Sequence, residues 1–158
     1  HIWRGHSDTE VILAYFDSIG IEATLAKFEG MFAIALWDRE EKVLYLIRDR
    51  IGEKPLYYGY LHDTFVFASE LKAIRVHPKF ATAINHDAIA QLLLHNCIPA
   101  PLSIYNGIYK LEPGSMIKLD YSQYQSHVLP KSEQYWQLSS FLSIAYDESF
   151  SIASDKLE

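Results

Sequence analysis

The chain has 158 residues, of which 49% are hydrophobic and 22% charged, and its formal net charge is −6. This is the composition of a globular protein rather than a disordered one, and the acidic surplus argues against nucleic acid as a partner. There is no run of about 18 apolar residues to cross a membrane, and the single cysteine, Cys97, excludes an internal disulfide framework, so we expect a soluble, cytoplasmic protein.

A helix signal stands near the start of the chain. Ser7-Asp8-Thr9-Glu10 matches the S-x-x-E capping box, and apolar residues then recur on one helical face as far as Ile19. Gly20 is typical of the residue after a helix, and a short second helix is expected over 22–28. Because neither an initiator Met nor a signal-peptide pattern precedes this helix, we expect the chain to be part of a longer polypeptide.

The next segment changes from helical to strand-like patterning. Continuous apolar runs at 31–37 and 43–47, joined by polar residues, predict a hairpin of strands covered on both faces. Two further strands are expected over 55–60 and 64–69. Neighbouring strands with short links predict an antiparallel sheet flanked by helices, an α+β fold.

The second half of the chain predicts shorter elements. Asn85 suits the N-cap of a helix, and Pro113-Gly114 suits a turn before a strand. From about Tyr121 the Ser, Gln and Tyr content indicates a linker or domain boundary. The expected elements are helices over 70–75 and 87–95, a strand over 116–119 and a helix-like end over 149–158, with 103–110 ambiguous.

Generic chemical motifs are scarce. The seven histidines and one cysteine have no metal-ligand spacing, and the glycine-rich phosphate-binding loops are absent, so no metal or nucleotide site is expected in this chain. Cys97 lies near His95, and a Cys–His pair can form an activated nucleophile. Side chains two positions apart at a helix end do not face each other, however, so Cys97 is expected to be a small buried residue.

Two charged positions have both a structural and a functional interpretation. Arg48-Asp49-Arg50 follows an apolar strand and fits a local ion-paired turn, or a rigid turn that presents Arg48 or Lys54 to a carboxylate or phosphate. Asp8 falls in a first helical turn, where the helix dipole stabilises a carboxylate by about 0.3–1 kcal/mol. The same carboxylate could receive a ligand ammonium group, although spacing alone favours the structural role in both cases.

Several sequence motifs occur in a fixed order along the chain, and their combination is more specific than any one of them. The chain resembles the glutamine amidotransferase domain of glutamine-hydrolysing asparagine synthetases, the class II, N-terminal-nucleophile type, over about residues 6–136. The resemblance implies a partial four-layer αββα sandwich with antiparallel sheets. It divides the chain into the C-terminal portion of the amidotransferase domain, 1–120, and a linker with the start of the synthetase domain, 121–158. The motifs are 7–13, 30–38, 48–58 and 67–74, continued by His77-Pro78, 103–108, 111–114 and Tyr135-Trp136.

The resemblance also implies a reaction. In this family an N-terminal cysteine thiol attacks the side-chain amide of glutamine, and the released ammonia passes through a tunnel to the synthetase domain, where it converts ATP-activated aspartate into asparagine. Asp8 matches the residue that binds the α-amino group of glutamine, and Met31 matches a residue of the tunnel wall. An apolar wall suits neutral ammonia, although Met31 could equally be core packing. The implied partners are glutamine, the chain's own C-terminal synthetase domain and, in a homodimer, a second copy.

Other parts of the family pattern are absent from these residues. The family's nucleophilic cysteine precedes the motif at 7–13, and Cys97 does not match it. The glutamine-binding arginine and the asparagine–glycine oxyanion segment are also missing, and the pyrophosphate loop for ATP and Mg would lie after Glu158. We therefore expect no catalytic residue and no cofactor in this chain, which alone would be inactive.

Two interpretations remain open at this point. The chain is part of a glutamine-dependent asparagine synthetase, or of a relative that amidates another carboxylate. Alternatively, it is a catalytically dead amidotransferase-like domain, of the β-lactam synthetase type, that serves as a structural or interaction module. In either case, sheets that lack their opening strands would expose an apolar face or an unpaired edge, so the isolated chain is expected to be marginally stable or self-associating.

Overall fold

The computed structural model describes residues 5–140; the helix expected over 149–158 lies outside them. Helices and antiparallel strands follow one another along the chain in a mixed order. In sequence they are α1 (Asp8–Ile19), α2 (Ile21–Lys27), β1 (Ala33–Asp38), β2 (Val43–Arg48), β3 (Tyr57–Leu61), β4 (Thr64–Ala68), α3 (Leu71–Arg75), α4 (His86–His95), β5 (Ile108–Lys110), β6 (Ser115–Leu119), α5 (Tyr121–Ser126) and β7 (Ser132–Gln134).

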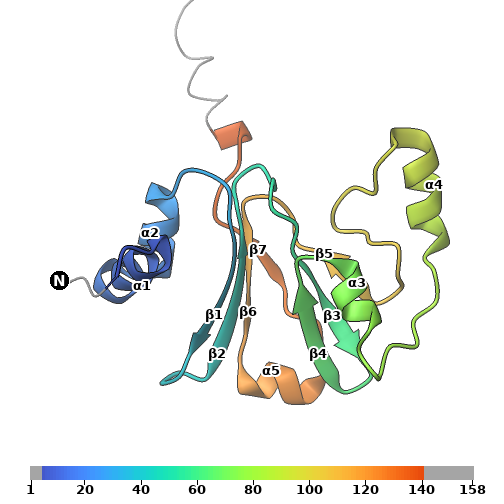
Figure 1. Ribbon diagram of the computed structural model, residues 1–158, viewed down its shortest axis with the longest axis horizontal. Helices are drawn as coiled ribbons and strands as arrows, with labels where there is room; N and C mark the ends of the chain where they lie inside the picture. Colours follow the sequence, from blue (N-terminus) through green and yellow to red (C-terminus); the bar gives the residue numbers. More distant parts are fainter. Residues whose placement is uncertain (1–4, 141–158) are drawn as a thin grey trace, which may run out of the picture.

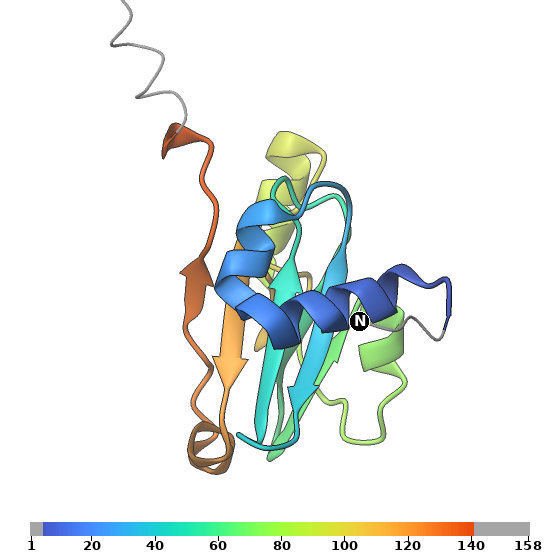
Figure 2. The same ribbon diagram turned by 90° about the vertical axis from the view of Figure 1, so that its left-hand side faces the viewer.

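The strands form two stacked antiparallel sheets between helices. One sheet has the order β1-β2-β6-β7 and the other β4-β3-β5. Helices α1 and α2 lie on the outer side of the first sheet, and α3 and α4 on the outer side of the second (Figure 1). Figure 2 shows α1 crossing the strands that it covers. The layers are therefore αββα, which confirms the predicted α+β class with antiparallel sheets.

Three hydrophobic clusters fill the three interfaces between these layers. Neighbouring residues of β2 point to opposite sides, because successive strand side chains alternate: Leu46 enters the cluster between the sheets and Ile47 the cluster beneath α1 and α2. This double burial explains why β2 reads as a continuous apolar run. The main members are Leu46, Tyr58 and Ile117 between the sheets, Phe16, Leu25 and Ile47 under α1 and α2, and Leu61, Ile74 and Ile108 under α3.

Strand β1 differs from the prediction that both of its faces are covered. Ile34 and Leu36 pack toward α1 and α2, but Trp37, on the opposite face, is 54% exposed. On β4, Phe67 is likewise 42% exposed. Within the described residues no strand pairs with the outer edges of β1 and β4, so an apolar cavity of about 310 Å³ opens between the sheets. Its lining includes Trp37, Leu44, Phe65, Phe67 and Leu119.

The segment after Tyr121, which the composition indicated as a linker, continues the fold. Helix α5 begins with a full capping box, since Asp120 accepts the backbone N–H of Gln123 at 2.8 Å and Gln123 accepts that of Asp120 at 3.1 Å. The chain then returns as β7, which pairs with β6. Residues 121–134 thus form a helix and a strand of the first sheet, and the proposed division into two domains at residue 120 stays a prediction.

Candidate functional site

Asp8 is the first residue of α1, and local hydrogen bonds orient its carboxylate. Its Oδ1 accepts the backbone N–H of Thr9 at 2.8 Å and the hydroxyl of Ser7 at 3.3 Å. Ser7 is the N-cap and also accepts the Thr9 N–H, at 3.2 Å. The expected capping box is not formed in its usual way, because the Glu10 carboxylate accepts the N–H of Gly5 at 2.8 Å. Asp8 is thus held on a fixed helix start.

The position of α1 decides what Asp8 can reach. The N-terminal end of α1 extends past β1, the outer strand of its sheet (Figure 2). Asp8, the first residue of α1, is exposed at this end of the helix. An exposed carboxylate on a rigid element can receive a cationic group of a ligand.

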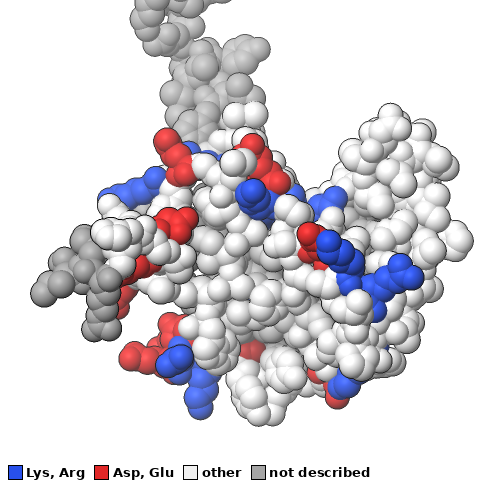
Figure 3. Space-filling view, in the orientation of Figure 1, with Lys and Arg blue, Asp and Glu red and all other residues white. Residues whose placement is uncertain are grey.

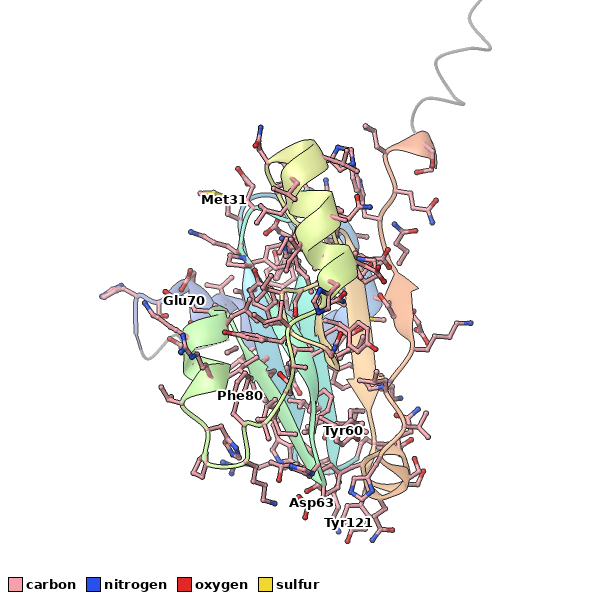
Figure 4. All side chains as sticks on the ribbon, turned by 90° about the vertical axis from the view of Figure 1, so that its right-hand side faces the viewer. Met31, Tyr60, Asp63, Glu70, Phe80 and Tyr121 are labelled. Carbon is pink, nitrogen blue, oxygen red and sulfur yellow. The ribbon has the colours of Figure 1, made fainter. Side chains whose placement is uncertain are left out.

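Met31 lies elsewhere, in the loop that leads into β1. Its side chain is 59% exposed and points away from the sheets (Figure 4). The next residue, Phe32, accepts the backbone N–H of Asp49 through its carbonyl at 3.0 Å, which joins the Met31 loop to the end of β2. The structure therefore places Asp8 and Met31 at different points, one past the edge of the first sheet and the other at the end where β1 begins.

The turn after β2, residues 48–54, is the most densely hydrogen-bonded polar feature at that end. Arg48 is 6% exposed, and its guanidinium donates to the carbonyl oxygens of Lys54 at 2.8 Å, Gly52 at 2.5 Å and Leu111 at 2.5 Å. The fully buried Asp49 carboxylate accepts the N–H groups of Glu53 and Lys54, both at 2.9 Å. The turn is therefore held by charge-to-backbone hydrogen bonds and not by the expected ion pair.

Burial and hydrogen bonding shift the pKa values of these two groups. Desolvation lowers the pKa of Arg48, although the nearby Asp49 charge opposes that shift. Burial by itself would raise the pKa of Asp49, but hydrogen bonds from backbone N–H groups, including those of Lys54 and Glu53, outweigh it and hold the pKa below its usual value. Both side chains are buried and directed at backbone groups, so Arg48 holds the turn rather than presenting its guanidinium to a ligand.

Arg50 extends this network to the helices and to the end of the described chain. Its guanidinium donates to the carbonyl of Ala26 near the end of α2 at 2.9 Å and lies 6.0 Å from the centre of the Trp136 ring. Tyr135 donates its hydroxyl to the Arg48 carbonyl at 2.7 Å. Arg50, Tyr135 and Trp136 line a cavity of about 370 Å³, together with Ala26, Gln134, Gln137 and Ser140. The sequence singled out Tyr135-Trp136 as a motif, but it did not indicate that these residues contact Arg48 and Arg50.

Cys97 is exposed, which corrects the expectation that it is buried. Helix α4 ends at His95, and Asn96 adopts a left-handed conformation that turns the chain, so Cys97 follows in a loop rather than in the core. Residues 5–140 contain no group of His, Cys, Asp and Glu that could hold a metal ion. No helix among the same residues is long and apolar enough to cross a membrane.

Two antiparallel sheets packed face to face between helical layers define an αββα sandwich protein. The chain belongs to the glutamine amidotransferase domain family, whose model matches residues 1–136. Asparagine synthetase [glutamine-hydrolyzing] 1 of Bacillus subtilis is 38% identical over 113 residues, which cover 72% of this chain and 18% of that protein. A relative from Methanocaldococcus jannaschii is 33% identical over 144 residues, covering 90% of this chain and 27% of its own.

A solved structure supports the fold. The allosteric regulatory enzyme of purine biosynthesis superposes with a TM-score of 0.57 and 22% identity, over 87% of this chain and 24% of that one. The sandwich is thus part of the N-terminal-nucleophile amidotransferase fold. The chain spans only about a fifth to a quarter of the length of these sequence relatives.

Proposed function

We propose that the chain is part of a glutamine-dependent asparagine synthetase. Glutamine hydrolysis supplies ammonia, which reaches an aspartate activated by ATP and yields asparagine. The attacking cysteine, the ATP and the Mg ion belong to parts of the enzyme other than this chain. Within the chain, Asp8 binds the α-amino group of glutamine and Met31 lines the path of ammonia, while the synthetase part of the same polypeptide is the partner.

One observation carries the role of Asp8. Its carboxylate is exposed at the start of α1, which extends beyond the outer strand β1 (Figure 2), and is oriented by Ser7 and Thr9. An ammonium ion is a compact charge that forms short hydrogen bonds with such a carboxylate. The group is held before the ligand arrives, which reduces the cost of ordering it on binding.

The proposal is tested by a glutaminase assay on the complete gene product that contains this chain, comparing wild type with Asp8→Asn. Loss of a charge-assisted hydrogen bond costs about 1.5–3 kcal/mol. We therefore expect the KM for glutamine to rise by about 10- to 100-fold. Synthesis from added ammonia should be unchanged, because ammonia does not need the glutamine site.

Asp17→Asn is the matched control, since Asp17 is an exposed aspartate of the same helix at its opposite end. An unchanged KM in Asp8→Asn, or an equal rise in Asp17→Asn, would refute the role of Asp8. Synthesis from ammonia but never from glutamine would instead favour the catalytically dead, structural type of domain. The dependence of ammonia release on the N-terminal cysteine of the gene product separates these two cases.

A further inference from the structure

The helices cover only part of the outer face of the first sheet. Figure 2 shows α1 and α2 in front of β1 and β2, with β6 and β7 beside them. A cavity of about 560 Å³ opens along the junction of α1 and α2, and it is larger than the cavity between the sheets. We call it the outer groove. Its lining includes Ile21, Glu22, Tyr45, Met116, Lys118 and Glu133.

The strand register defines the floor of the outer groove. Tyr45 of β2 pairs with Lys118 of β6, and Met116 of β6 pairs with Glu133 of β7. Directly paired residues point to the same face of a sheet, so these four side chains share the outer face. Tyr45 and Met116 also belong to the hydrophobic cluster under α1 and α2. The groove therefore has an apolar base that is continuous with the core, and three strands hold it in place.

Three charged side chains line the groove without a charged partner. Glu22, Lys118 and Glu133 are exposed, and within residues 5–140 none of them forms an ion pair. The Lys118 Nζ lies 5.7 Å from the centre of the Tyr45 ring, and this cation–π contact keeps the ammonium at the groove. The outer groove thus offers one cation and two anions beside an apolar base.

We propose that the outer groove binds a free α-amino acid with an apolar side chain. The carboxylate of such a ligand pairs with the Lys118 ammonium. Its ammonium group has three N–H donors, which serve the carboxylates of Glu22 and Glu133. Its apolar side chain covers Tyr45 and Met116. The cavity volume lies within the range of about 300–1,000 Å³ that is typical of small-molecule sites.

The outer groove is a different site from the one proposed for glutamine. Ile19, the last residue of α1, lines the groove, whereas Asp8 is the first residue of the same helix. At the rise of an α-helix the two residues are about 16 Å apart along the axis. The inference therefore goes beyond the proposed function and does not depend on it.

Isothermal titration calorimetry of the complete gene product with L-leucine tests this proposal. We expect a Kd of about 1 mM or tighter. L-Leucinamide, which lacks the carboxylate, and isocaproate, which lacks the ammonium group, should bind at least about 10-fold more weakly. Lys118→Met and the double variant Glu22→Gln/Glu133→Gln should each weaken L-leucine binding by at least about 10-fold, because each removes one of the two charge pairings.

Charged side chains of both signs lie over α1 and α2 (Figure 3), so the controls remove charges elsewhere. Lys27→Met, at the other end of α2, and Asp8→Asn should bind L-leucine like wild type. Equal melting temperatures will show that all variants are folded. No binding at about 10 mM L-leucine would overturn the proposal, as would equal affinity for L-leucinamide or undiminished binding by Lys118→Met. Loss of binding in Asp8→Asn would also overturn it, because L-leucine would then occupy the glutamine site. An unchanged KM for glutamine in Asp8→Asn refutes only the proposed role of Asp8, so the two proposals fail separately.

Discussion

At the residue scale, the two buried charges at the end of β2, Arg48 and Asp49, hold the backbone of the following turn and not a ligand. Asp49→Asn replaces one accepting oxygen by an NH₂ group that faces a backbone N–H, so the Glu53 or the Lys54 N–H loses its partner. We expect a loss of about 2–3 kcal/mol in the free energy of unfolding at pH 7. Denaturant titration measures it, with Asp17→Asn as the control. Equal midpoints for both variants would show that the turn does not depend on this carboxylate.

The same substitution predicts a pH dependence. The pKa of Asp49 is below 3.8 in the folded protein, so folding favours the charged carboxylate. Its contribution is fully present above the unfolded pKa and is lost as the pH falls through the folded one. The stability difference between wild type and Asp49→Asn should therefore shrink below about pH 4. A difference that stays constant down to acid unfolding would contradict this assignment.

Tyr135 predicts the opposite pH dependence, a loss of folding stability as the pH rises. Burial, followed by the charge of Asp49, raises its pKa to about 12 from 10.0. Since folding favours the neutral phenol, its contribution is present below pH 10 and is lost as the pH rises toward 12. Tyr135→Phe should cost about 1 kcal/mol at neutral pH, for the hydrogen bond to the Arg48 carbonyl, and should have a weaker decline of stability above pH 10 than wild type. The control variant Tyr121→Phe, at an exposed tyrosine, should show the wild-type decline of stability above pH 10. An equally weakened decline in this control would show that Tyr135 is not responsible.

At the scale of elements, β3 approaches β5 closely because Gly59 has no side chain. A Cβ at Gly59 would lie 2.2 Å from the Gly107 carbonyl oxygen, and the two strands pair directly at Gly59 and Ile108. Gly59→Ala should therefore push the strands apart and cost about 3 kcal/mol or more. Gly107→Ala separates this steric effect from backbone strain. Gly107 has a φ of 75°, and a Cβ there would meet nothing within 4 Å. The Gly107→Ala substitution should therefore lower the free energy of unfolding by only about 1–2 kcal/mol. Equal melting temperatures for the two variants would contradict the steric explanation.

The elements also show what the sequence could predict. Apolar runs and caps located β1, β2, β3, β4 and β6 to within two residues, and Asn85 caps α4 as expected by accepting the Asp87 N–H at 3.0 Å. The short strands β5 and β7 carry little pattern of their own, since each is defined by its pairing with a distant strand. For the same reason the partners of Arg48 were not predictable: the Leu111 carbonyl is 63 positions away. Only the resemblance to the amidotransferase family points to Asp8 and Met31 as functional residues, and their roles stay predictions.

At the scale of the whole molecule, the unpaired side of the sandwich is its weak point. The outer edges of β1 and β4 present free backbone groups within the described residues, and the cavity between them is lined by aromatic side chains. Such edges are templates for pairing with another chain. The expectation that the isolated chain is marginally stable or self-associating stays a prediction, and these two edges and the exposed Trp37 and Phe67 give it a physical basis.

Trp37→Lys tests that expectation on the isolated 158-residue chain. Trp37 is 54% exposed, lies on edge strand β1 and lines the cavity, so a lysine there adds a charge where a second copy would pair. Sedimentation equilibrium should show concentration-dependent association of the wild type and at least about tenfold weaker association of the variant, equivalent to about 1.4 kcal/mol. Leu13→Lys, which adds the same charge at an exposed site on α1, should associate like wild type. A wild-type chain that is monomeric at every concentration and melts in one sharp, cooperative transition would show that the open edges are protected by means other than a second strand.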